Sequence, residues 1–273
     1  MESRNNRQYV GGSRYSGAQS PKEDKIEMIF GSRPILEAML AGKTLEKIFL
    51  QRGTRNSTTD EISTLAKKLD VPVATVPVEK LNNLTRKNHQ GAVAFISAIS
   101  YAPLDEIVTS LFEKGKVPLL LILDRITDVR NFGSIARNAE CMGVDAIVIP
   151  SRGGAQINAD AIKTSAGALH LVPVCREANL KNTLDYLKDY GVQLVACTEK
   201  TEDQLTEAAV DMTGPTAILM GSEEDGISPE YLKRADARLR IPLMGQISSL
   251  NVSVATGIIL YEAMRQRLNE AKA

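Results

Sequence analysis

The chain has 273 residues, of which 43% are hydrophobic, and this length is enough to bury the core of one or two domains. No apolar run reaches the roughly 18 residues that span a bilayer, the N-terminus is too polar for a secretion signal, and the three cysteines and two histidines form no familiar disulfide or zinc pattern. The sequence therefore predicts a reduced, cytoplasmic protein with no metal site.

The charge of the chain is balanced overall but is unevenly distributed. Residues 1–100 carry 15 Lys/Arg against 10 Asp/Glu, a net charge of +5, which leaves −5 for residues 101–273. A basic front part is typical of a module that binds RNA. Chance clustering of solvated charges explains the same asymmetry equally well.

The first hundred residues divide into a tail and a compact unit. Residues 1–25 are rich in Gly, Ser, Asn and Arg and have almost no aliphatic side chains, so they predict a disordered basic tail. Residues 26–100 predict a small α/β domain. Its expected strands are 28–31, 45–51, 71–76 and 91–99, and its expected helices are 33–42 and 60–69.

One loop of this domain, TRKNHQG at 85–91, is polar and basic. It enters a strand at a glycine, as an ordinary turn does. Arg86, Lys87 and His89 are nevertheless candidates for RNA contacts, because cationic side chains bind phosphates. The two interpretations are equally supported by the sequence.

After a predicted linker with a short helix at 101–116, the strands become continuous aliphatic runs. Runs without alternation indicate strands that are covered on both faces, and hence a parallel sheet with helices between its strands. The expected strands are 119–123, 146–149, 171–174, 193–197, 217–220 and a short one in 239–245, and the expected helices are 133–144, about 158–169, 179–191 and one at the C-terminus.

Three glycine-bearing loops follow strands of this sheet: DVRNFGS (128–134), GSEEDGIS (221–228) and LMGQISSLN (243–251). Open α/β sheets bind ligands at the carboxyl ends of their strands. Neither a dinucleotide fingerprint nor a P-loop is present. Gly221 permits either close approach of a ligand or a simple turn. Arg137, in an otherwise apolar helix, meets either an anion or a surface carboxylate.

The segments LDRITDVRNFGSIARNAECMGV (123–144), ILMGSEEDGIS (218–228) and IPLMGQISSLNVSVATGIILYEAMRQR (241–267) resemble, in order and spacing, the three motifs of SPOUT-class (TrmH-like) RNA ribose 2′-O-methyltransferases. AQINADAIKTSAGA (155–168) is similar to the family's intervening segment. One departure is Val129, where the family usually has proline.

The resemblance implies an α/β fold in which a parallel-sheet SPOUT domain with a deep trefoil knot (117–273) follows a ribosomal-protein-like RNA-binding domain (26–100). It also implies transfer of a methyl group from S-adenosylmethionine to a ribose 2′-hydroxyl, and a homodimer in which Arg137 faces the partner's cofactor. The implied cofactor-binding residues are Leu219, Gly221, Ile241 and Leu250, and the implied polar active-site residues are Asn131, Arg137, Glu223, Ser249 and Asn251.

Two roles are open for Arg137. The family is sometimes assigned an arginine as general base, but a guanidinium keeps its proton in proteins, so we favour a contact with phosphate and the developing alkoxide. Ser249 or Asn251 also suits the N-cap of the last helix.

The RNA substrate is open as well. The most similar branch methylates a guanosine in bacterial 23S rRNA, and the presence of the front domain favours rRNA. The alternatives are a D-loop guanosine of tRNA, another rRNA ribose, and a non-catalytic RNA-binding protein.

Overall fold

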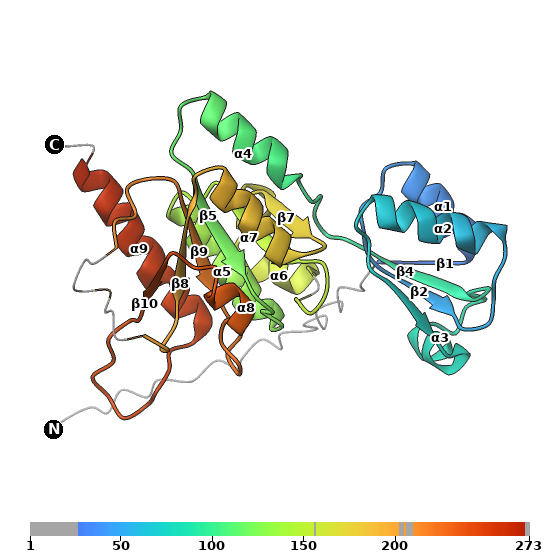
Figure 1. The fold of residues 1–273 in the computed structure, drawn as a ribbon. Coiled ribbons are helices and arrows are strands. Elements are labelled where there is room, and N and C mark those ends of the chain that lie inside the picture. Colours follow the sequence, from blue (N-terminus) through green and yellow to red (C-terminus); the bar gives the residue numbers. More distant parts are fainter. Residues whose placement is uncertain (1–26, 156, 202–204, 206–209, 271–273) are drawn as a thin grey trace, which may run out of the picture.

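The computed structural model describes residues 27–155, 157–201, 205 and 210–270, which form two domains (Figure 1). The tail predicted at 1–25 lies outside the described residues. The front domain contains a four-stranded sheet of order β1-β4-β2-β3, in which β2 and β3 are parallel and the other pairs are antiparallel. Its strands are β1 (Met28–Phe30), β2 (Leu45–Gln51), β3 (Val73–Val76) and β4 (Ala92–Ile96).

Helices cover both faces of this front sheet. On one face α1 (Ser32–Leu40) and α2 (Ser57–Lys68) contribute Ile35 and Ile62 to a core with β2 and β4. On the other face Leu81 of α3 (Val78–Leu84) packs with Phe49, Val93 and Phe95. The sequence did not predict α3, because seven residues are too few to show a helical period.

The second domain contains a six-stranded sheet in which every pairing is parallel, so the predicted parallel sheet is confirmed. The strand order is β10-β8-β9-β5-β6-β7. The strands are β5 (Leu119–Leu123), β6 (Ala146–Pro150), β7 (Val174–Glu177), β8 (Gln193–Cys197), β9 (Thr216–Met220) and β10 (Ala237–Leu239). The expected strand in 239–245 was placed too late, and residues 240–251 form neither strand nor helix.

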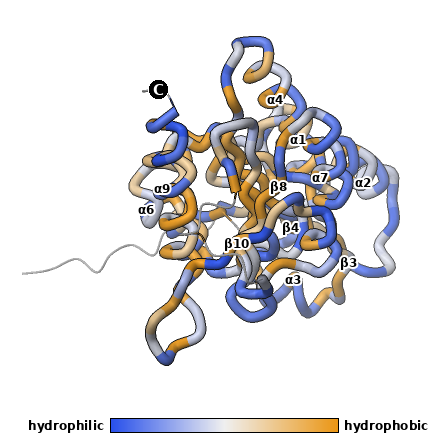
Figure 2. The backbone as a smooth tube through the Cα atoms, turned by 60° about the vertical axis from the view of Figure 1, so that its left-hand side comes forward, coloured by the Kyte–Doolittle hydropathy of each residue, from blue (hydrophilic) through white to orange (hydrophobic). Residues whose placement is uncertain are grey.

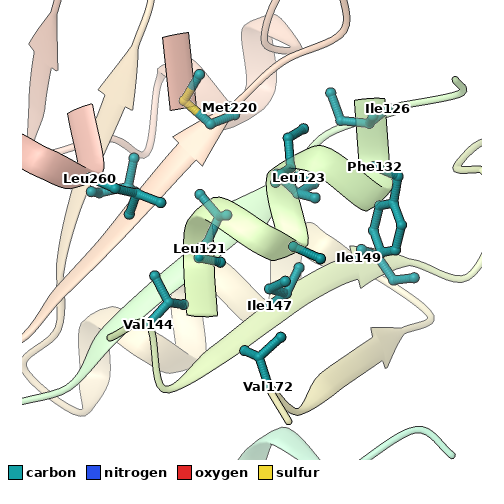
Figure 3. Packing of buried hydrophobic residues seen from close by; sticks show 14 of the residues in the cluster. Leu121, Leu123, Ile126, Phe132, Val144, Ile147, Ile149, Val172, Met220 and Leu260 are labelled. Carbon is teal, nitrogen blue, oxygen red and sulfur yellow. The ribbon is translucent and has the colours of Figure 1, made fainter. Parts of the chain in front are cut away.

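The two faces of this sheet carry separate cores. Helices α5 (Val129–Cys141), α6 (Ala159–Thr164) and α9 (Val252–Glu270) cover one face, and their apolar side chains pack on those of β5, β6 and β9 (Figure 3). Helices α4 (Leu104–Glu113), α7 (Leu180–Asp189) and α8 (Pro229–Leu232) cover the other face.

Two of these packing contacts bear on the predicted organisation. Leu104 and Val108 of α4 are buried in the second core, so the helix in the stretch predicted as a linker packs against the second domain. A Cβ added at Gly133 of α5 would lie 2.7 Å from the carbonyl oxygen of Ala161, so the contact between α5 and α6 requires glycine at this position.

The C-terminal helix α9 is fixed at both ends. At its start the Oδ1 atom of Asn251 accepts a hydrogen bond of 2.9 Å from the backbone N–H of Ser253, so of the two candidates, Ser249 and Asn251, it is Asn251 that caps the helix. Near its end the half-buried guanidinium of Arg267 donates to four backbone carbonyls at 2.8–3.0 Å, including those of Pro118 and Gly214 just before β5 and β9.

Residues 240–251 leave the body of the molecule between β10 and α9 as a protruding loop that carries several apolar residues (Figures 1 and 2). Met244 is 99% exposed and Ile247 is 80% exposed, although burial of such side chains is favourable. The trefoil knot implied for this part of the chain stays a prediction.

Candidate active site

The loops after β5 and β9 and the start of α9 meet at the carboxyl edge of the parallel sheet. They enclose a cavity of about 230 Å³. Its lining comes from 125–128 and Asn131, from 222–225, and from Gly153 and Val252. This is the edge at which a parallel sheet is expected to bind its ligand.

Three of the predicted polar residues are in contact beside this cavity. The Nδ2 atom of Asn131 donates to Oε1 of Glu223 at 2.5 Å, and the Nδ2 atom of Asn251 donates to Oδ1 of Asn131 at 3.0 Å and to Oε1 of Glu223 at 3.2 Å. Because these residues come from three segments of the chain, only the fold brings them together. We call Asn131, Glu223 and Asn251 the polar triad.

The positions of the triad residues are set by local hydrogen bonds. Asp128 caps α5 by accepting from the backbone N–H groups of Arg130 and Asn131, both at 2.8 Å, and so places Asn131 in the first turn. Asn251 caps α9, and its Oδ1 atom also accepts from the hydroxyl of Ser253 at 2.6 Å. Two helix N-termini therefore point toward the triad, where they favour negative charge.

A second network, which the sequence did not single out, holds the loop after β9. Arg125 donates to Asp124 at 3.1 Å, to Asp225 at 3.0 Å and to the carbonyl of Gly226 at 3.2 Å. Asp124 is almost fully buried and accepts from the N–H of Ser228 at 2.7 Å. The hydrogen bond to Asp124 raises the pKa of Arg125, so the guanidinium remains charged. The sequence feature that could have indicated this network is the Asp124-Arg125 pair directly after the buried strand β5.

Gly221 lies at the end of β9, where the chain folds back on itself. A Cβ added there would lie 2.1 Å from the backbone carbon of Gly226 and 2.2 Å from the backbone nitrogen of Ile227. No rotation of a flexible side chain relieves such a contact. Close packing within the loop is therefore enough to require glycine at position 221, without any approach of a ligand to its backbone.

Arg137 lies away from the polar triad. It is exposed, and it lines a separate, shallower cavity of about 620 Å³ between α5 and α9, with Met142, Ile258 and Tyr261 among its neighbours. Within the described ranges no hydrogen bond or ion pair is found for Arg137, so the surface salt bridge, one of the two alternatives that the sequence left open, is not formed there. The two regions are connected through Ser253, which lines this cavity and contacts Asn251.

The remaining predicted site residues are dispersed. Leu219 is buried in the core beneath α4 and α7, so its side chain faces away from the cavity edge. Ile241 is half-buried, and Leu250 and Ser249 are exposed in the protruding loop. None of these four lines the cavity beside the triad.

In the front domain, His89 differs from its two basic neighbours. The Nδ1 atom of His89 accepts from the N–H of Gly91 at 3.1 Å, which leaves the proton on Nε2 to donate to Asn82 at 2.9 Å. His89 is nearly buried and fixes the loop. Arg86 and Lys87 are exposed, and the ammonium of Lys87 lies 5.0 Å from the centre of the Phe30 ring.

Two further observations concern metal sites and membrane-spanning helices. Across residues 27–155, 157–201, 205 and 210–270, no group of three or more His, Cys, Asp or Glu side chains is arranged to hold a metal ion. Within the same ranges, no helix has both the length and the apolar character that crossing a bilayer requires.

Both domains match known families. Residues 118–261 match the SpoU rRNA Methylase family, and residues 28–102 match the family described as RNA 2′-O ribose methyltransferase substrate binding. The first match spans the parallel sheet and the polar triad, and the second spans the front domain. The fold and the site therefore define an RNA 2′-O-ribose methyltransferase.

Relatives along most of the chain agree with this class. A protein of Staphylococcus haemolyticus named "Putative TrmH family tRNA/rRNA methyltransferase" is 37% identical over 88% of this chain and 96% of its own length. Among solved structures, an AdoMet-bound rRNA methyltransferase from Sinorhizobium meliloti has a TM-score of 0.53 and 25% identity over 87% of this chain and 86% of that one.

A third comparison covers less of the molecule. The TrmH/SpoU tRNA modifying enzyme of A. aeolicus is 34% identical, with a TM-score of 0.51, over 62% of this chain and 86% of that one. The chain belongs to the SpoU rRNA methylase family.

Proposed function

We propose that this protein transfers a methyl group from S-adenosylmethionine to the ribose 2′-hydroxyl of a guanosine in bacterial 23S rRNA, in the cytoplasm. The observation that carries the proposal is the polar triad, Asn131, Glu223 and Asn251, at the carboxyl edge of the sheet. In sequence, this sheet follows a domain that matches the substrate-binding family. The tRNA-modifying relative matches only 62% of this chain, whereas the rRNA methyltransferase matches 87%, and this difference favours rRNA over tRNA.

The residues at the site suit one part of the cofactor better than another. Glu223, Glu224 and Asp225 line the cavity, and their carboxylates favour a sulfonium cation. A volume of about 230 Å³ is below the roughly 300–1,000 Å³ of ordinary ligand sites, so this cavity suits part of the cofactor. We assign the adenine end to Ile241, Leu250 and the backbone around Leu219 and Gly221, since an aromatic ring would cover the exposed apolar side chains of the loop.

The bound cofactor supplies an activated methyl group, and the protein's own residues position and stabilise the acceptor. In the proposal, the triad and Ser249 orient the ribose. Arg137 contacts the adjacent phosphate and the developing negative charge on the 2′-oxygen, as a planar guanidinium does with two hydrogen bonds.

The position of Arg137 supports a dimer. Because Arg137 lies on the α5–α9 surface and away from the triad of its own chain, we propose that it completes the site of a second copy. Val254, Ile258 and Tyr261 of α9 are partly exposed on the same surface, and pairing with an equivalent face would bury them.

The proposal is tested by incubating the purified protein with S-adenosylmethionine carrying a labelled methyl group and with transcripts of 23S rRNA or tRNA, and then mapping 2′-O-methyl groups. We expect one modified guanosine in 23S rRNA. Modification of tRNA only, or of another nucleoside, would replace the substrate assignment. If the protein binds the cofactor but transfers no methyl group to either RNA, the alternative of a non-catalytic RNA-binding protein would replace the proposal.

A further inference from the structure

The two domains meet at a buried cluster of three side chains, which we call the junction cluster: Glu46, Tyr101 and Arg176. Glu46 is at the start of β2 in the front domain, and Arg176 is in β7, at the edge of the parallel sheet. Tyr101 is in the connection between the domains. The side chain of Arg176 is 5% exposed and that of Glu46 is 10% exposed.

The contacts within the cluster join all three segments. The Tyr101 hydroxyl donates to Oε2 of Glu46 at 2.5 Å, and the Arg176 guanidinium lies 4.1 Å from the centre of the Tyr101 ring. The Nη1 atom of Arg176 donates to the carbonyl of Leu45 at 3.2 Å and lies 3.8 Å from Oε2 of Glu46. Burial, followed by the charge of Glu46, strongly raises the pKa of Tyr101, so its hydroxyl keeps the proton that it donates.

The connection between the domains is held in the same region. The backbone N–H of Ala102 donates to the carbonyl of Val174 in β7 at 2.9 Å, and Ile99 is buried in the core of the catalytic domain. The connection therefore follows the edge of the parallel sheet and is anchored on both sides of Tyr101. A chain anchored in this way has little freedom to reorient the front domain.

The orientation matters because the junction adjoins the candidate active site. A cavity of about 320 Å³ between the domains is lined by Lys47, Arg152, Gly153 and Arg176, among others. Gly153 also lines the cavity beside the polar triad. If the front domain binds RNA as proposed, a strand that runs from it to the site passes the side chains of Lys47 and Arg152.

We infer that Arg176 is a positioning residue, which fixes the RNA-binding domain relative to the methyl-transfer site through Glu46 and Tyr101. A buried cation and a buried anion stabilise a structure only while they face each other, because either one alone pays for its desolvation without compensation. The observed arrangement holds the two charges 3.8 Å apart, although the buried Nε atom of Arg176 has no hydrogen-bond partner among the described residues. Separation of the domains at this junction would expose each charge to solvent or leave it buried without its partner.

The inference is tested first by geometry, which does not depend on the proposed function. Spin labels at Glu61→Cys in α2 and Lys181→Cys in α7, two exposed positions, report the distance between the domains, with the exposed native cysteine removed by Cys141→Ser. We expect one narrow distance distribution in the otherwise unchanged protein. Arg176→Met, which removes the charge and the donors, should broaden this distribution.

Three further variants separate the cluster from general damage. Tyr101→Phe removes one hydroxyl and should broaden the distance distribution less than Arg176→Met does. Arg176→Lys keeps the charge, so its distribution should be narrower than that of Arg176→Met. Arg234→Met is the matched control, because the partner of Arg234, Asp185, lies in the same domain at 2.8 Å. The control should leave the distribution unchanged. A narrow distribution in Arg176→Met would overturn the inference.

The kinetic consequence rests on the proposed function. With RNA and cofactor saturating, the single-turnover rate of Arg176→Met should fall by at least about tenfold, because a misplacement of about 1 Å in a bound substrate can cost on the order of 100-fold. Cofactor affinity, measured by calorimetry, should stay within about twofold. A broadened distribution with an unchanged rate would refute positioning and leave the junction cluster as a structural contact.

Discussion

The polar triad and the Arg137 surface, which lie on either side of Ser253, are built in opposite ways. In the triad every side chain already has a partner within the chain, and two of the residues lie at helix N-termini. Arg137 is exposed, no partner is found for it within the described ranges, and its neighbours on α9 are partly exposed apolar side chains. The comparison shows that the fold itself organises the polar triad, whereas the Arg137 surface is left open, and in the proposed function RNA and a second copy cover it.

The largest effect is expected at Arg137. Arg137→Ala removes no contact found within the described residues, so the variant should fold and bind the cofactor as before. Its single-turnover methyl transfer at saturating RNA should fall about 100-fold or more, the scale of losing an electrostatic donor to the transition state. Arg130→Ala, on the same helix and also exposed, is the matched control. Near-normal transfer by Arg137→Ala would remove this residue from the chemistry.

Arg137→Lys sharpens the same comparison. Lysine keeps the charge but loses the planar fork, so partial recovery relative to alanine indicates electrostatic stabilisation. If the arginine instead acted as a general base, lysine would equal or exceed it at high pH, because an ammonium group deprotonates more readily. A rate profile over pH distinguishes the two roles.

Gly221→Val should act through the fold. The added Cβ meets the backbone at Gly226 and Ile227, so the loop must shift, and we expect a loss of about 1–3 kcal/mol in the free energy of unfolding. Gly214→Val is the control, since a Cβ at Gly214 meets nothing within 4 Å. Normal denaturant stability of Gly221→Val together with lost cofactor binding would instead favour a direct ligand contact.

Asn251→Ala, in the triad, and Ser249→Ala, outside it, should differ in stability. Asn251 caps α9 and contacts Asn131 and Glu223, so its loss should cost about 1 kcal/mol in the free energy of unfolding. Ser249 is exposed, and its substitution should change stability by less than about 0.5 kcal/mol. Urea titrations of the two variants measure the difference, and equal stabilities would contradict the capping role.

The smallest effect is expected in the front domain. Arg86→Ala should weaken RNA binding several-fold and lower the slope of log affinity against log salt by about 1, as the loss of one phosphate contact does. His89→Ala, by contrast, should act through the loop that His89 stabilises, without a change in this slope. Filter-binding titrations over a range of salt concentrations measure both, and an unchanged slope in Arg86→Ala would exclude this contact.

The sequence predicted the parallel sheet because its strands are uninterrupted aliphatic runs, which need no partner to be recognised. It predicted Asn131, Glu223 and Asn251 only through resemblance, because residues 120 positions apart have no local pattern that joins them. The junction cluster escaped prediction for the same reason: Glu46, Tyr101 and Arg176 are unremarkable in their own segments, and only the packing of two domains makes them a unit.

The position of the protruding loop was also beyond the sequence. The aliphatic residues of 239–245 favour a strand, but β10 ends at Leu239, and Pro242 has no N–H with which to extend the ladder. A local pattern records what a segment is able to form, whereas the neighbouring strand decides where pairing stops.

Because Arg267 contacts the carbonyls that precede β5 and β9, the last helix of the chain holds the first strand of the catalytic sheet. During synthesis the front domain is complete once β4 has emerged, and domains fold in the order in which they appear. The hydrogen bonds from Arg267 to the carbonyls before β5 and β9 form only after α9 has been synthesised. A nascent chain therefore acquires the RNA-binding unit well before it acquires the enzyme.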